Sequence, residues 1–153
     1  MANSTRHQIM DAVLTALEGI STGAGYQTTV KHVSENWIPY TEMELKNVPA
    51  VFPVDSDESK EYVAIGIGTD AVEAVLTILC TCYVYDAKND TRLKRTNLMR
   101  DVEKAICNNA ALDALIEFIE PGDVTTDRGT IKDWSIWEQQ FQITYRYSST
   151  LGG

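Results

Sequence analysis

Residues 72–85 read VEAVLTILCTCYVY, and their alternating side chains are the strongest indication of the fold. Its even-numbered positions, from Val72 to Val84, are uniformly apolar, whereas its odd-numbered positions, from Glu73 to Tyr85, are mixed. Because side chains of a strand alternate between the two faces of a sheet, the pattern predicts one long strand whose apolar face meets the core. The mixed face is expected to be partly exposed or to lie against another subunit.

A basic helix and a second long strand follow this stretch. Residues 91–108 read TRLKRTNLMRDVEKAICN, and Asp90 before them is the expected N-cap. Apolar residues recur here at the spacing of one helix face, and they predict its buried stripe: Leu98, Val102, Ala105 and Ile106. Residues 134–147, WSIWEQQFQITYRY, alternate again, with Gln139 interrupting the apolar face.

The rest of the chain predicts one more helix and several short strands. Thr5 and Gln8 form a capping box before an amphipathic helix, which the glycine-rich residues 21–25 end. The other expected elements are a strand over 26–33, a helical turn within 39–47, an edge strand over 48–54, a strand over 62–67, a short strand over 114–120 and a turn at Pro121 and Gly122.

Together these elements predict an α+β fold for a single domain over residues 1–153. The sheet should be mixed but mainly antiparallel, with about five or six strands and two helices packed on one face. Residues 148–153 are small or polar and predict a frayed C-terminal tail.

Composition limits the class of protein. The chain has 153 residues, of which 44% are hydrophobic, and a net charge of −9. The first residues, MANSTRHQIMD, lack the basic-then-apolar order of a signal peptide, and no stretch is apolar enough to span a membrane. The three cysteines are therefore expected to be free thiols in a reducing compartment. The negative charge argues against duplex DNA binding, in which phosphate neutralisation supplies most of the affinity.

One motif imitates a nucleotide site. Gly66, Gly68 and Ala71 fit the G-x-G-x-x-G/A pattern, and Asp86 lies where a ribose-binding acid is expected. A dinucleotide-binding unit needs a helix and a second strand between these points, but the residues there alternate as one strand. We therefore predict no cofactor.

Other chemical motifs are equally incomplete. Asp55, Asp57 and Ser59 imitate the start of a calcium loop, but Lys60 stands where glycine is required. The only histidines, at 7 and 32, have no metal-ligand spacing. We predict a non-enzymatic protein with no catalytic and no metal-binding residues.

Two charged segments and two tryptophans are the candidate functional residues. The segment 55–61 reads as a mobile acidic hairpin loop, whose carboxylates are Asp55, Asp57, Glu58 and Glu61. The helix carries five basic and two acidic side chains, and we interpret the basic ones as docking residues for an acidic neighbour: Arg92, Lys94, Arg95, Arg100 and Lys104. The alternatives are an ordinary solvated face and direct contact with phosphate, which the surrounding negative charge opposes. Trp134 and Trp137 are three apart on a strand and must face opposite ways, so at least one is a candidate interface residue.

The order of these elements resembles the tail-terminator (tail-completion) proteins of long-tailed bacteriophages. The resemblance covers nearly the whole chain and consists of layout and loose motifs. These are the helix over 6–20, GYQTTV at 25–30, ELKNVPAV at 44–51, the acidic segment, the long strand, the basic helix, DRG at 127–129 and FQITYRY at 141–147.

The resemblance implies a structural role in the virion, at the head–tail junction, after synthesis in the host cytoplasm. It implies a ring, usually a hexamer, that caps the tail tube protein, stops its polymerisation and meets head-completion or neck proteins, with a contractile sheath protein as a further partner where one exists. DNA would pass through the lumen without specific binding, and the acidic segment is the candidate lining because negative charge repels phosphate.

Two other functions stay open from the sequence. A head-completion or stopper ring would share this size and acidity, and would bind the portal or its adaptor instead of the tube. A small enzyme or ligand-binding domain would need a site between subunits, recognisable as a deep pocket with converging polar groups.

Overall fold

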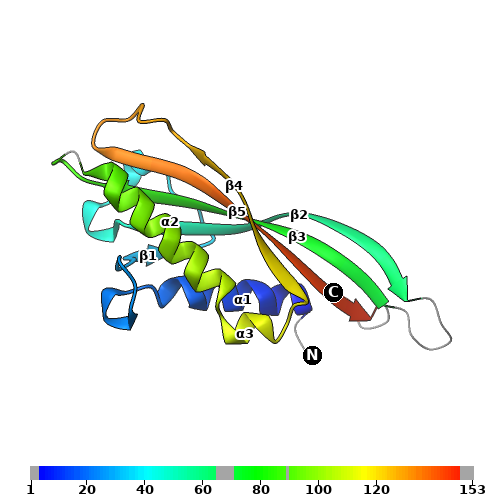
Figure 1. Cartoon of the computed structure of the whole chain (residues 1–153). Coiled ribbons are helices and arrows are strands. Elements are labelled where there is room, and N and C mark those ends of the chain that lie inside the picture. Colours follow the sequence, from blue (N-terminus) through cyan, green and yellow to red (C-terminus); the bar gives the residue numbers. More distant parts are fainter. Residues whose placement is uncertain (1–3, 65–70, 89, 149–153) are drawn as a thin grey trace.

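The computed structural model describes residues 4–64, 71–88 and 90–148, and it shows an α+β fold (Figure 1). The helices are α1 (Thr5–Glu18), α2 (Thr91–Cys107) and the short α3 (Ala110–Asp113). The strands are β1 (His32–Val33), β2 (Ala50–Ala64), β3 (Ala71–Tyr85), β4 (Phe118–Thr126) and β5 (Trp134–Ser148). They form one mixed sheet in the order β1-β2-β3-β5-β4, in which only β1 and β2 run parallel. The predicted fold class is confirmed.

The helices cover one face of this sheet, as the alternation of β3 predicts. The even positions of β3 from Val72 to Val84 are all buried, and most odd positions are only partly buried. Antiparallel pairing sets Ile78 opposite Phe141 and Cys82 opposite Trp137, so the apolar faces of β3 and β5 form one floor. Helices α1 and α2 pack on that floor and enclose the main core.

Helix α2 is held to the sheet by its predicted stripe and by one polar contact. Leu98, Val102, Ala105 and Ile106 are all buried. Gln139, the interruption in β5, is buried as well; its Nε2 donates to the Met99 carbonyl at 3.0 Å and its Oε1 accepts from Trp137 Nε1 at 3.2 Å. A polar residue fits the apolar face here because both ends of its amide have partners.

Most of the strand that the sequence predicts over residues 26–33 is absent, and a buried carboxylate binds the backbone there instead. Asp101 of α2 is 3% exposed and accepts the backbone N–H groups of Gln27 and Thr28. Since these N–H groups bond to a side chain, residues 26–31 form no strand, and only His32–Val33 pairs with β2. The β-branched composition of the segment reflects packing against the core, which Tyr26 and Val30 contact.

Other boundaries differ from the prediction because local contacts decide them. Ser4, not Thr5, caps α1, since its Oγ accepts from the His7 backbone N–H at 3.2 Å. Asp90 precedes α2 as expected but makes no side-chain cap hydrogen bond. The helical turn within 39–47 is present as two short 3-10 turns, Tyr40–Glu42 and Leu45–Asn47.

The predicted turn at Pro121 and Gly122 is wrong. Both residues lie inside β4, which pairs with β5 from Phe118 onward, and the pairing shifts register between Pro121 and Val124. A bulge at a sheet edge accommodates proline without a turn, because no ladder hydrogen bond has to be donated there. The short strand predicted over 114–120 therefore begins later and runs further, through Thr126.

Three predicted features fall largely on residues outside the described ranges. These are Gly66 and Gly68, the end of the strand predicted over 62–67, and all of the C-terminal tail except Ser148, which ends β5. Ala71 begins β3, so the residues before Asp86 form the single strand that argues against a dinucleotide-binding unit.

The buried thiols predict that the protein loses stability in alkali. Cys80 and Cys82 are fully buried in the core, and burial raises the pKa of Cys80 to about 12 and that of Cys82 well above its ordinary value. A pKa that is higher in the folded chain stabilises the fold below the unfolded value, near 8.5, and this contribution falls as pH rises above it. We expect the free energy of unfolding to fall above about pH 9 by up to roughly 1.4 kcal/mol per pH unit for each thiol.

Urea titrations between pH 7 and 11 measure this effect. The matched control is the variant Cys80→Ala/Cys82→Ala, which should be less stable at pH 7 but show a flatter dependence on pH. Equal slopes for the two proteins would mean that the thiols do not set the alkaline limit.

Candidate assembly interface

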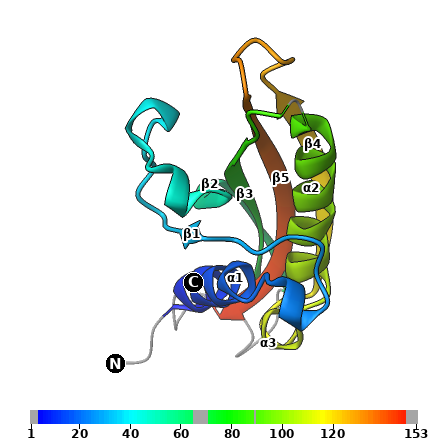
Figure 2. The ribbon, with the colours of Figure 1, turned by 90° about the vertical axis from the view of Figure 1, so that its left-hand side faces the viewer.

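The second face of the sheet is not covered by any α-helix of the described residues. The elements α1, α2 and α3 all pack on one side, whereas residues 34–49 cross to the other side and cover the part of it formed by the start of β2, the end of β3 and the start of β5 (Figure 2). Beyond that cover, apolar side chains on the second face stay open to solvent, including Val54 at 39% and Phe118 at 52% exposure. We call this face, made by the odd positions of β3 and the residues beside them, the open face.

A small aromatic cluster anchors residues 34–49 to the open face. Ala50, Phe52 and Tyr83 are buried, and the residues packed on them are Ile38, Tyr40, Met43, Trp134 and Ile136. The Tyr83 hydroxyl donates to the Ile38 carbonyl at 2.7 Å, and burial raises the pKa of Tyr83. This hydrogen bond and the ring contacts hold residues 34–49 against the sheet, and we call this segment the wall.

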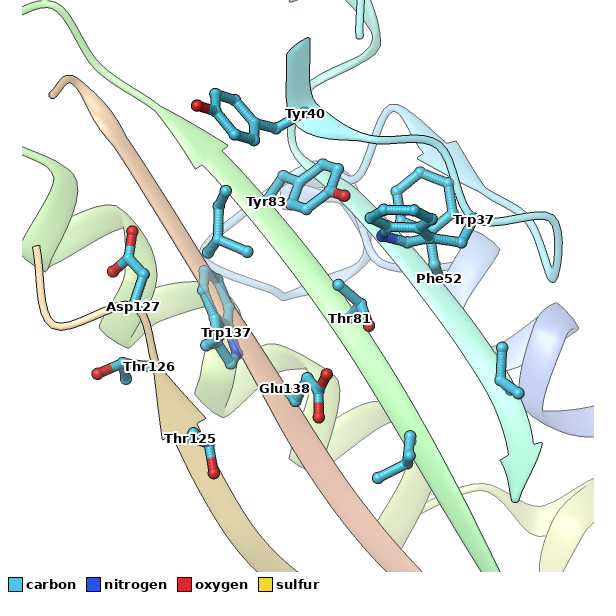
Figure 3. A pocket seen from close by; sticks show the side chains of 13 residues that line it. Trp37, Tyr40, Phe52, Thr81, Tyr83, Thr125, Thr126, Asp127, Trp137 and Glu138 are labelled. Carbon is cyan, nitrogen blue, oxygen red and sulfur yellow. The ribbon is translucent and has the colours of Figure 1, made fainter. Parts of the chain in front are cut away.

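The wall and the end of β4 enclose a groove of about 620 Å³. Figure 3 shows Trp37, Tyr40 and Phe52 toward one side, Thr125, Thr126 and Asp127 on the other, and Thr81, Tyr83 and Glu138 between them. Trp37 is 57% exposed at the rim, so a large aromatic side chain is available to a partner. The lining is mainly apolar and aromatic, a composition typical of protein interfaces.

Two carboxylates border this groove. Glu138 is exposed on β5. Asp127 Oδ1 accepts from the Gly129 backbone N–H at 3.0 Å, whereas Asp127 Oδ2 is buried without a hydrogen-bond partner in the described structure. The turn after Asp127 is tight, with Arg128 and Gly129 both at positive φ. The groove therefore combines apolar walls with negative charge at one rim.

The predicted acidic hairpin loop is wrong. Residues 55–61 lie within β2, which pairs with β3 on both sides of a bulge between Asp55 and Glu58. Asp55 and Glu58 face the helix side and hold Arg6 of α1, whose Nε donates to Asp55 Oδ2 at 2.8 Å and whose Nη1 bonds Glu58. The Tyr145 hydroxyl donates to the other Glu58 oxygen.

The contacts of Asp55 and Glu58 with Arg6 and Tyr145 explain why the charged residues 55–61 can form part of strand β2. The Glu58 carboxylate is 5% exposed, and burial together with its hydrogen bond to Glu58 raises the pKa of Tyr145. Burial lowers the pKa of Arg6, but the hydrogen bonds and negative charge of Asp55 and Glu58 outweigh it and leave the pKa raised. Only Asp57 and Glu61 of the four predicted carboxylates are exposed.

We expect the four carboxylates to differ in their effect on stability. Glu58→Gln removes the charge that Arg6 and Tyr145 contact and should lower the free energy of unfolding by about 1–2 kcal/mol. Asp57→Asn and Glu61→Gln, the matched controls, should change it by less than about 0.5 kcal/mol. Urea denaturation followed by far-UV circular dichroism measures this, and equal effects at 57, 58 and 61 would contradict the contact.

The five basic residues of α2 divide into two groups. Three have partners within the chain. Lys94 bonds Asp86 and the Tyr85 carbonyl, Arg95 Nη1 donates to Ser135 Oγ at 3.1 Å, and Lys104 donates to the Gly25 carbonyl and lies over the Tyr26 ring.

Arg92 and Arg100, the other two, are exposed, and their side chains have no ion-pair or hydrogen-bond partner within the described residues. They are the members of the predicted docking set that remain available to a partner.

The two tryptophans face opposite ways, as predicted, but their roles differ. Trp134 is half-buried on the open-face side, where its ring contacts Tyr40, Tyr83 and Tyr85. Trp137 is 1% exposed and belongs to the main core. Trp137 is therefore a core residue that also lines the floor of the groove, and its docking role stays a prediction.

Sequence reasoning missed the wall of the groove. Its signal was present in Trp37, Ile38 and Tyr40, which are apolar or aromatic residues in a segment with no strand alternation. Such residues are expected to cover part of a core or an interface.

Comparisons with known proteins add no identification. The chain matches no protein-family model, and no curated protein is significantly similar to it. Within residues 4–64, 71–88 and 90–148, no group of three or more histidine, cysteine, aspartate or glutamate side chains is placed to hold a metal ion. In the same residues, no helix has the length and apolar character needed to cross a membrane.

Proposed function

We propose that this protein is a structural protein of a bacteriophage tail, a tail terminator that forms a ring on the end of the tail tube. The observation that carries the proposal is the open face: a long sheet covered by helices on one side only, with an aromatic groove on the other. A surface of this kind is expected to be covered in a complex, because burying exposed apolar groups against a partner lowers the free energy.

The layout of the chain supports the choice among assembling proteins. The order of an N-terminal helix, long strands, a basic helix and a closing aromatic strand resembles that of tail terminators, and the helices and strands have this order in the fold. The proposed mechanism is capping. One side of the ring binds the last ring of tube protein, the other side offers no such contact, and growth stops.

The charge distribution is compatible with DNA passage through such a ring. The chain carries a net charge of −9, and six copies would surround the lumen with a strongly negative field. Asp57 and Glu61 are the exposed carboxylates of the acidic segment and remain the candidates for the lumen wall. Proteins bind DNA tightly when their cations neutralise phosphates and release counterions. A negatively charged lumen wall makes no such contacts, so DNA is expected to pass without binding.

A capping assay tests the proposal with purified components. Tube protein of the same phage is polymerised with increasing amounts of this protein, and tube lengths are measured by negative-stain microscopy with a gold label on the added chain. We expect one labelled end per tube and no growth beyond it. Unlabelled tubes of unchanged length, with binding to portal or adaptor rings instead, would assign the protein to the head side of the neck.

A further inference from the structure

We propose that the open face of one copy binds the outer surface of α2 from a second copy, so that subunits join head to tail. The inference specifies the contact within the proposed ring, and it rests on the proposed function for the closure of that ring. Its two surfaces are the groove with its acidic rim and the exposed side of α2.

The position of the two surfaces favours a head-to-tail contact. The buried stripe of α2 faces the sheet, so its opposite side points away from the molecule on the helix layer. The groove lies on the other face of the same sheet, between residues 34–49 and the end of β4 (Figure 3). Two different patches on opposite sides of a subunit form a heterologous contact, which closes into a ring when the rotation per subunit allows it.

The charges of the two surfaces are complementary. Arg92 and Arg100 project from α2 without a partner in the described structure. On the open face, Glu120 and Glu138 are exposed and lie on neighbouring strands β4 and β5, and neither forms an ion pair within the described residues.

Arg146 is the only cation that strands β2 to β5 place on this face within the described residues, and its Nη2 lies 3.1 Å from Glu73. Glu103 is also exposed on α2, so within the described residues that surface has two exposed, unpaired cations and one exposed carboxylate and is positive on balance, whereas the charges of the open face are negative on balance. This difference favours association of the two surfaces over contact of either surface with itself.

The apolar side chains match as well. Leu93 of α2 is 54% exposed and lies seven residues before Arg100, so the two share the outer side of the helix. The groove offers the exposed side chains of Trp37 and Val54 to such a side chain. An amphipathic helix placed in an apolar groove is a common mode of recognition, in which a few anchors provide the affinity.

A mixing experiment with two charge-reversal variants tests the contact. Arg92→Glu/Arg100→Glu reverses the helix, and Glu120→Lys/Glu138→Lys reverses the open face. All four positions are exposed, so folding should be retained, and circular dichroism checks this. Self-association is measured by sedimentation velocity and native mass spectrometry up to about 1 mM protein.

Each variant alone should self-associate roughly 100-fold more weakly than the wild-type chain, because like charges meet at every contact. An equimolar mixture should recover association, since each variant then presents a surface of the opposite sign to the other. The recovered complexes should contain the two variants in alternation and equal number.

Surface reversals outside both patches, Glu18→Lys and Lys31→Glu, are the matched controls and should leave association unchanged. A mixture that stays dissociated, variants that associate like the wild-type chain, or a wild-type chain that is monomeric throughout would each overturn the inference. The capping assay does not depend on which surfaces form the ring. A negative result in the mixing experiment would therefore overturn this contact but not the proposed function, which the capping assay tests.

Discussion

Replacement of Trp137 by alanine is expected to lower the free energy of unfolding by about 4 kcal/mol. The indole is 1% exposed between β3, β5 and α2, and its Nε1 donates to Gln139 Oε1. Removing it leaves a cavity beneath α2 and leaves the buried Gln139 Oε1 without its donor, although Gln139 Nε2 can still donate to the Met99 carbonyl. Urea denaturation followed by far-UV circular dichroism measures the loss.

Trp134→Ala is the matched control, because the same residue type is lost from the same strand. Trp134 lies half-buried among tyrosine rings on the opposite face, where neighbours and water can fill part of the space. We expect a loss of about 1–2 kcal/mol there. If Trp134→Ala proved more destabilising than Trp137→Ala, the assignment of Trp137 to the core would be wrong.

The second large effect is expected at Asp101. Asp101→Ala should lower the free energy of unfolding by about 3 kcal/mol, because the backbone N–H groups of Gln27 and Thr28 lose their acceptor. Those two bonds attach residues 26–31 to α2. We therefore also expect faster hydrogen exchange at these two amides, measured by NMR or mass spectrometry.

Asp101→Asn separates this role from packing. Asparagine has nearly the same volume but one acceptor oxygen, so it can hold only one of the two N–H groups. We expect an intermediate loss of about 1.5 kcal/mol. A stability equal to that of the wild-type chain in both variants would contradict the carboxylate contact.

The type and the buried face of long periodic segments could be predicted from the sequence, because many residues of each segment fit one pattern. Fourteen positions of 72–85 alternate, and the stripe of α2 repeats over more than two turns, so their faces were predicted correctly. Two matching long strands and two helices left few arrangements besides one sheet with helices on one side.

The failures share a different cause. At 26–33 the β-branched residues satisfy packing while Asp101, distant in sequence, takes the backbone N–H groups. At 55–61 a run of charges suggested a loop, but Arg6 neutralises two of them inside the strand. Both outcomes depend on side chains more than 45 residues away, and local patterns contain no signal for such contacts.

The interface could be predicted only in part. The basic character of α2 is visible in the sequence, but which cations remain available depends on Asp86, Ser135 and Gly25, which bind the other three. The groove is assembled from residues 34–49, three strands and the end of β4, so its shape follows only from the tertiary structure.

The proposed capping role can be tested in the lysate of a phage in which this gene is disrupted, by negative-stain microscopy. We expect tails of uncontrolled, excessive length beside unattached heads, with normal length restored when the gene is supplied in trans. Tails of normal length beside leaking or unjoined heads would contradict it, because the protein would then act on the head side of the neck.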